Sequence, residues 1–132
     1  MNTESFSIII VENQHLMRKG LSSTLSMHGF DVVAEVIDSK HILQTASKLT
    51  PNLILFSVNH PSLDDLKRIN DLRKEIPSTL ILALVTGEFR GQEQAARDAG
   101  AHIVLTKSVL TSELVNAIKK LKKLQPANYL SV

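Results

Sequence analysis

Polar side chains of several chemical types follow the apolar runs of this chain, at the points where the runs end. They are an acid and an amide after the first run, a hydroxyl after the third, and a hydroxyl and a lysine after the last two: Glu12, Asn13, Ser57, Thr86 and Lys107. Carboxylate, amide and hydroxyl oxygens can hold a cation or accept hydrogen bonds, and a lysine can bind an anion or pair with the acid. An open parallel sheet binds its ligands at the carboxyl ends of its strands, so these side chains are expected to share one pocket.

The elements that position this pocket are short apolar runs that alternate with helical stretches. The runs are rich in Ile, Leu and Val and alternate weakly in polarity, which is typical of strands buried on both faces. They predict strands over about residues 7–12, 31–37, 53–58, 80–86 and 102–106. Apolar residues at helical spacing predict helices over 14–28, 40–49, 64–76, 88–99 and 112–124. This alternation predicts a doubly wound α/β fold, a five-stranded parallel sheet flanked by five helices.

Turn-forming residues agree with these boundaries. Gly29 and Gly100 stand where a left-handed residue closes a helix, and Pro51 and Pro77 lie just past helix ends. Three serines are expected to cap the second, third and fifth helices at their amino ends: Ser39, Ser62 and Ser112.

Length and composition narrow the classes of function. The chain has 132 residues, 43% of them hydrophobic, a net charge of +2 and no cysteine. The missing cysteine excludes disulfide scaffolds, thiol nucleophiles and iron–sulfur clusters, and the small charge does not by itself indicate nucleic-acid binding. No apolar run approaches the ~20 residues of a membrane span, and no signal-peptide pattern opens the chain, so a cytoplasmic protein is expected. No glycine-rich phosphate loop follows the first run, so we expect neither an enzyme nor a bound cofactor.

Three separated segments resemble one known family. Residues 8–21 (IIIVENQHLMRKGL) are similar to a strand that ends in two acids and leads into a helix with a basic residue. Residues 51–66 (PNLILFSVNHPSLDDL) are similar to a strand that ends in a phosphoacceptor aspartate, and residues 99–108 (AGAHIVLTKS) to a turn, a strand and an active-site lysine. The chain thus resembles the response-regulator receiver domain of two-component signal transduction, in its NarL/FixJ-like subgroup. The resemblance implies a CheY-like fold over residues 1–124, with 125–132 as the start of a linker or C-terminal tail.

The main departures from the family pattern lie at the predicted pocket. Ser57 stands where the family has the aspartate that accepts the phosphoryl group, and Glu12 and Asn13 stand where it has two acids. A serine cannot form an acyl phosphate, and one carboxylate in place of three is expected to lose Mg²⁺. Thr86 resembles the hydroxyl residue that follows the phosphoryl group, whereas Val104 stands where the family often has a switching aromatic residue. The resemblance therefore implies an atypical receiver, or pseudo-receiver, that works without phosphorylation.

Within this pocket we expect Glu12 and Lys107 to pair, with Ser57, Asn13 and Thr86 filling the remaining hydrogen bonds. Such an arrangement holds the pocket in one conformation. The pair is either a static contact that satisfies a partly buried lysine or a charge switch. Ser57 is either a small polar residue at the end of a buried strand or a phosphoserine acceptor.

Other readings of the polar residues stay open. One is a working phosphoreceiver that uses another acid as its phosphoryl acceptor, for which Asp64 and Asp65 are the nearest candidates. His60, in the loop after the third strand, is either solvated or a pH sensor near neutrality. The other histidines show no metal-ligand spacing and are expected at the surface or at its boundary: His15, His28, His41 and His102.

Two groups of residues are candidate interaction surfaces. The first is a basic run at the end of the last predicted helix: Lys119, Lys120, Lys122 and Lys123. These lysines either complement the helix dipole and cover apolar surface with their stems, or form a basic patch beside a DNA-binding neighbour or a partner's acidic helix. The second group is apolar and lies outside the helical period: Phe89, Val109 and Leu110. The resemblance implies homodimer or partner contacts through the fourth helix, fifth strand and fifth helix, or through the first and fifth helices.

Together these features predict a regulatory and dimerisation module that works without phosphorylation. Residues 128–132 resemble the linker that leads, in NarL-like regulators, to a helix-turn-helix domain. The chain is therefore expected to be the N-terminal part of a DNA-binding transcriptional regulator, with DNA bound only through a C-terminal domain. The competing hypothesis is a stand-alone adaptor that docks a signalling partner protein and has no DNA role.

Overall fold

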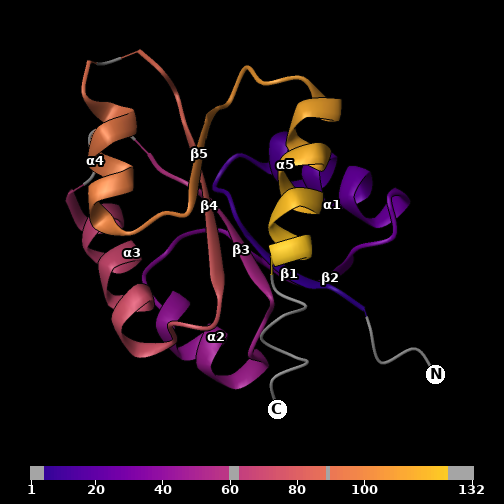
Figure 1. Cartoon of the computed structure of the whole chain (residues 1–132), viewed down its shortest axis with the longest axis horizontal. Helices are drawn as coiled ribbons and strands as arrows, with labels where there is room; N and C mark the ends of the chain where they lie inside the picture. The colour runs from indigo at the N-terminus through magenta and orange to yellow at the C-terminus, as the bar shows by residue number, and fades with distance from the viewer. Residues whose placement is uncertain (1–4, 60–62, 89, 125–132) are drawn as a thin grey trace.

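The computed structural model describes residues 5–59, 63–88 and 90–124. Five parallel strands form one sheet in the order β2-β1-β3-β4-β5, and helices cover both of its faces (Figure 1). The strands are β1 (Ser7–Val11), β2 (Asp31–Val36), β3 (Leu53–Ser57), β4 (Leu80–Val85) and β5 (Ile103–Thr106). The helices are α1 (His15–Met27), α2 (Ile42–Leu49), α3 (Leu63–Glu75), α4 (Gln92–Ala99) and α5 (Thr111–Leu124). The doubly wound, CheY-like fold predicted from the sequence is confirmed.

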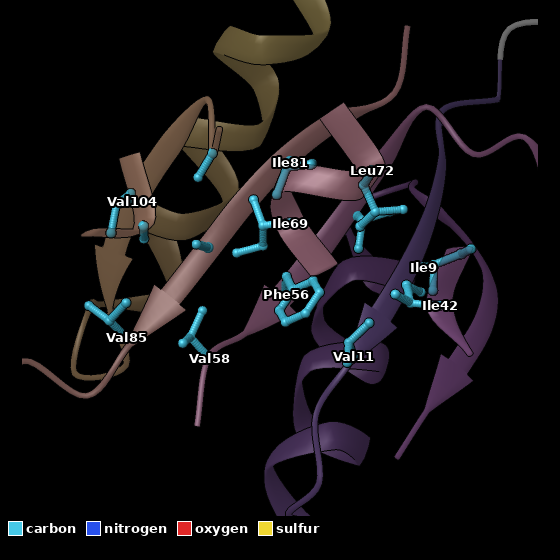
Figure 2. Packing of buried hydrophobic residues seen from close by; sticks show 14 of the residues in the cluster. Ile9, Val11, Ile42, Phe56, Val58, Ile69, Leu72, Ile81, Val85 and Val104 are labelled. Carbon is cyan, nitrogen blue, oxygen red and sulfur yellow. The ribbon is translucent and has the colours of Figure 1, made fainter. Parts of the chain in front are cut away.

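The central strands are buried on both faces, as their unbroken apolar sequences predict. Every residue of β3 is buried, and so is β4 beyond its first residue. Ile54 of β3 pairs in register with Ile9 of β1 and with Ile81 of β4. Because alternate residues of a strand point to opposite faces, this row and Phe56 share one cluster, under α2, α3 and α4 (Figure 2).

The opposite face of the sheet packs against α1 and α5. Its cluster joins Leu55 of β3 to Leu25 of α1 and Ile118 of α5. Phe6, just before β1, packs edge to face with Phe30, with ring centroids 5.9 Å apart. The two helical layers therefore have separate cores, and the sheet lies between them.

The predicted helix ends at two glycines are confirmed. Gly29 and Gly100 have φ angles of 87° and 128° and close α1 and α4. α4 is shorter than predicted, because Gly87 and Gly91 have φ angles of 82° and 83° in the segment before it. A left-handed residue interrupts a helix, so α4 starts only at Gln92.

The serine caps are not as predicted. Ser39 does not cap α2, which begins at Ile42, because its hydroxyl donates to Asp65 of α3 instead. Ser112 is not a cap either, because α5 already begins at Thr111. Ser62 lies outside the described residues. None of the helices in the described segments is both long and apolar enough to cross a membrane.

Candidate functional site

The sheet brings the predicted pocket residues to one edge. Val11 and Phe56 are register partners on β1 and β3, so the chain reaches Glu12 and Ser57 at the same level of the sheet. On the other side, the backbone N–H of Lys107 donates to Val85 O at 2.7 Å and so extends the pairing of β4 with β5. The carboxyl ends of β1, β3, β4 and β5 thus collect the candidate side chains.

A buried ion pair lies at this edge. Glu12 is 1% exposed, and its Oε1 lies 3.5 Å from the Nζ of Lys107, whose side chain is 16% exposed. The other carboxylate oxygen, Oε2, accepts the backbone N–H of Gln14 at 2.9 Å. The backbone of Glu12 donates to Val36 O of β2 at 2.9 Å, which holds the carboxylate in place. One negative and one positive charge therefore face each other here.

The hydrogen bonds expected around this pair are not formed by the predicted side chains. Ser57 is 2% exposed, and its hydroxyl has no hydrogen-bond partner among the described residues. Thr86 turns toward α4 instead, and its Oγ1 donates to Gln92 Oε1 at 3.1 Å. Asn13 is exposed, and within the described segments no hydrogen bond joins it to the pair. The expectation that these three residues complete the ion pair is therefore wrong, because each either faces a different partner or has none.

Gln92 fixes the connection between β4 and α4. Its Oε1 accepts the Thr86 hydroxyl and also the backbone N–H of Gly87, at 2.9 Å. Gly87 has a positive φ of 82°, and a Cβ there would lie 3.2 Å from Cγ2 of Thr106. The backbone turn and the glutamine together hold the Thr86 hydroxyl against α4.

Arg18 is a residue of the site that sequence reasoning missed. It is 8% exposed, and its Nη1 donates to the backbone O of Glu12 at 3.0 Å. Its Nε lies 3.7 Å from Oε1 of Glu35 on β2, which also lies 3.0 Å from Lys19 Nζ. The hydrogen bond from Lys19 is the main reason that the pKa of Glu35 is lowered. A buried arginine needs acidic or carbonyl partners, but no local spacing in the sequence indicates that these come from β1 and β2.

A second polar network holds the start of α3. Asp65 is 5% exposed and accepts the Ser39 hydroxyl at 2.5 Å and the Asn59 backbone N–H at 3.0 Å. Arg68 donates to the Ser39 hydroxyl at 2.9 Å and lies 4.0 Å from Asp65 Oδ1. The carboxylate of Asp65 is thus engaged in joining two loops, whereas Asp64 is exposed. This engagement speaks against Asp65 as an alternative phosphoacceptor.

No metal centre is evident in the described part of the chain. No group of three or more His, Asp or Glu side chains there could hold an ion. His102 is half-buried, and its Nδ1 accepts the Ile81 backbone N–H at 3.0 Å. Burial, and then the charge of Arg73, lower the pKa of His102. His60 lies outside the described residues.

The predicted interaction residues have different environments. Leu110 is 66% exposed, whereas Val109 is partly buried against the α1–α5 cluster. Val104 is buried in the opposite core (Figure 2). Phe89 lies outside the residues that the structure describes. The four lysines of the basic run are all exposed: Lys119, Lys120, Lys122 and Lys123.

This strand order, with an acid and a lysine at the carboxyl edge, defines a CheY-like signalling fold. The chain belongs to the response regulator receiver domain family, whose model matches residues 8–119. A receiver domain is a signalling module rather than a classical enzyme.

Comparison with known proteins gives the same assignment. The nitrate/nitrite response regulator protein NarP of Escherichia coli (strain K12) is 30% identical over 115 residues, 86% of this chain and 54% of that protein. The transcriptional regulatory protein DegU of Brevibacillus brevis is 26% identical over 120 residues, 90% of this chain and 51% of that protein. The chain thus spans about half the length of these curated relatives.

Solved structures share the fold. The crystal structure of a response regulator receiver domain protein (CheY-like) from Methanospirillum hungatei JF-1 matches with a TM-score of 0.84 at 18% identity. The match covers 95% of this chain and 99% of that one. At this level of identity the likeness extends to the fold alone.

Proposed function

We propose that this chain is an atypical receiver that regulates without aspartyl phosphorylation, as the N-terminal part of a cytoplasmic DNA-binding transcriptional regulator. The observation that carries the proposal is the buried Glu12–Lys107 ion pair at the carboxyl edge, next to a strand that ends in Ser57. A serine hydroxyl has no carboxylate with which to form an acyl phosphate. The pocket therefore lacks an acceptor for the phosphoryl group at the end of β3.

The charges at this edge support the absence of a metal requirement. Mg²⁺ is usually held by one or two carboxylates together with phosphate oxygens. Glu12 already faces the Lys107 ammonium at 3.5 Å, and Asn13 and Ser57 add no negative charge. We infer that a divalent cation gains little here, because it would have to compete with the ammonium for a single carboxylate.

The hydrogen bonds of the β4–α4 connection support a locked conformation. A switch that responds to a phosphoryl group needs a hydroxyl that is free to turn toward it. The Thr86 hydroxyl instead donates to Gln92, which also accepts the Gly87 N–H. In the proposed mechanism the domain keeps one conformation and acts by dimerising or by docking a partner, which positions the DNA-binding part of the regulator.

The proposed DNA role is supported by the curated relatives. DegU of Brevibacillus brevis is described as a transcriptional regulatory protein, and this chain spans 51% of it. Reading what the gene encodes after Val132 tests this role. A helix-turn-helix domain is the expected result, and a stop codon would replace the DNA role by that of a stand-alone adaptor.

Phosphorylation is tested by incubating the chain with acetyl phosphate, or with beryllofluoride, in the presence of Mg²⁺. The intact mass after acetyl phosphate, and the amide NMR spectrum after beryllofluoride, are expected to stay unchanged. The variant Ser57→Asp is the matched control, because it restores a carboxylate at the end of β3 and should gain reactivity. A phosphoryl adduct on the unmodified chain would overturn the proposal.

A further inference from the structure

The two helical layers of the molecule differ in charge. α1 and α5 lie on one side of the sheet and α2, α3 and α4 on the other (Figure 1). In α3 and α4 acids and bases are interspersed, whereas α1 contains no acid and α5 contains only Glu113. The positive charge of the chain is therefore concentrated on the α1–α5 side.

Within that layer, the two bases of α1 share one acid. Arg18 and Lys19 lie 3.7 Å and 3.0 Å from Glu35. The bases of α5 have no such partner: among the described residues, no ion pair involves the lysine cluster, which we define as Lys119, Lys120, Lys122 and Lys123. Most of the uncompensated charge of the layer thus lies in the last turns of α5.

The lysine cluster is placed outward by its position in the helix. Leu121 is 3% exposed and packs into the core, so the residues on either side of it flank the buried stripe. Lys122 lies over the Phe6 ring, with its Nζ 6.0 Å from the centroid. Lys119 and Lys123 are one turn apart, about 6 Å along the axis, and both are exposed. Glu113, the acid of α5, lies about 9 Å further up the helix from Lys119.

We propose that the lysine cluster binds the phosphates of duplex DNA, independently of base sequence. Duplex DNA carries one negative charge per about 1.7 Å of its axis, which matches a short, dense row of ammonium groups. Protein interfaces are depleted of lysine and rely on apolar or aromatic anchors, and within the cluster the apolar Leu121 is turned inward. The chemistry of the surface therefore fits a polyphosphate backbone better than an acidic protein segment.

The place of the cluster in the fold fits this role. Helices of this fold run opposite to the strands, so α5 ends at the amino edge of the sheet, where Lys122 meets Phe6. This edge is opposite to the Glu12–Lys107 pair, and α5 ends there at Leu124. The helix dipole stabilises cations here, but it supplies no paired acid, and none of the ion pairs among the described residues reaches the cluster. The proposal deepens the proposed function, since the receiver itself would add phosphate contacts to those of a DNA-binding domain.

The test is fluorescence anisotropy of the 132-residue chain with a labelled duplex of about 20 base pairs and arbitrary sequence, titrated at several salt concentrations. Binding is expected at low salt and should weaken with a log–log slope of about −3.6, since each of the four lysines neutralises one phosphate and each neutralised phosphate contributes about −0.9. The double variant K119Q/K123Q should make the slope less negative by about 2.

The matched control is K67Q/K74Q, which removes the same charge from exposed positions of α3 on the opposite layer. It should leave the salt slope unchanged. Absence of binding at low salt, or an equal loss in both double variants, would overturn the proposal. Tighter binding to poly-glutamate than to DNA of equal charge would also overturn it, and would assign the cluster to an acidic protein partner.

Failure of this proposal is distinguishable from failure of the proposed function. A phosphoryl adduct at the carboxyl edge would overturn phosphorylation-independence and leave the lysine-dependent binding as it is. Conversely, a chain that forms no adduct and binds no DNA would overturn the role of the lysine cluster alone.

Discussion

At the scale of single residues, the arrangement of the pocket depends on a carboxylate that water hardly reaches. Glu12 has Lys107 beside one oxygen and the Gln14 N–H on the other, and Arg18 donates to its backbone carbonyl. A buried charge is unfavourable unless it is paired and hydrogen-bonded. Each charge of the pair therefore needs the other, and any ligand of the pocket would have to take the place of one of them.

Replacing Lys107 by methionine tests this dependence. We expect K107M to lower the free energy of unfolding by about 2–4 kcal/mol, because Glu12 stays buried without its partner charge. Urea denaturation near neutral pH measures the loss. In the double variant E12Q/K107M most of the stability should return, since no buried charge is left. If the losses of stability in the single variants E12Q and K107M simply added in the double variant, the two residues would not be coupled.

His102 gives the stability a pH dependence. Burial and the nearby Arg73 lower its pKa below the usual value of 6.5. As the pH falls through 6.5, the histidine of the unfolded chain binds a proton that the folded protein does not take up, so folding loses stability. Protonation in the folded state would also remove the acceptor of the Ile81 N–H.

We therefore expect the urea concentration at the unfolding midpoint to decrease as the pH is lowered from about 7.5 to about 5.5. The variant His102→Asn keeps an acceptor for the Ile81 N–H and does not titrate, so its midpoint should depend less on pH over this range. An unchanged slope in that variant would assign the pH dependence to other groups.

The sequence allowed the pocket residues to be located, but not their partners. Glu12, Ser57 and Lys107 could be placed at one edge because each follows an apolar run, and parallel strands end together. The partnership of Thr86 with Gln92 could not be predicted, because it depends on the turn between them. The same holds for Asp65 and Ser39, which lie 26 positions apart and meet only through the tertiary fold.

At the scale of elements, the end of α2 carries a local strain. Thr50 closes this helix with φ 42° and ψ 60°, and its N–H donates to Ala46 O at 2.8 Å. The left-handed conformation is sterically unfavourable for a β-branched residue, whereas glycine adopts it at no steric cost. The strain is offset by the proline that follows, Pro51, whose carbonyl accepts the Thr79 hydroxyl at 3.0 Å and so anchors the connection.

Relieving this strain should stabilise the protein. We expect Thr50→Gly to raise the free energy of unfolding by about 1 kcal/mol, measured as a shift in thermal midpoint. The control is Ser47→Gly, in the exposed middle of the same helix, which should lower stability by about 0.5–1 kcal/mol. Destabilisation by both substitutions would show that the Thr50 conformation carries no strain.

The ends of elements could be predicted where a backbone conformation sets them. They could not be predicted where they depend on which partner a side chain binds. Gly29 and Gly100 end helices because their conformation excludes most other residues. The start of α2 was misplaced because Ser39, a good capping residue by type, is used by Asp65 instead. Local propensity cannot register such competition, since both roles suit a serine hydroxyl.

At the scale of the whole molecule, the fold was predictable because its pattern is repeated. Each apolar run is short and β-branched or leucine-rich, and each is followed by one helical stretch, so several independent segments agree on one topology. The distribution of charge between the two layers was not predictable to the same degree. It depends on which helices share a face, and on Glu35 of β2 pairing with both Arg18 and Lys19.

This charge distribution bears on which face forms a homodimer. In a two-fold dimer a surface patch meets its own copy, so pairing that brought the carboxyl-terminal halves of α5 together would oppose two lysine clusters. Leu110, 66% exposed at the other end of α5, is free of that repulsion.

We therefore expect the unmodified chain to sediment as a dimer at micromolar concentration and the variant Leu110→Glu to sediment as a monomer. Beryllofluoride should not change the oligomeric state of either protein. Leu16→Glu, at a position of α1 that is 84% exposed, should leave the dimer intact. The reverse pattern would place the contact on α1 and α5, and a monomer at all concentrations would exclude dimerisation through this chain.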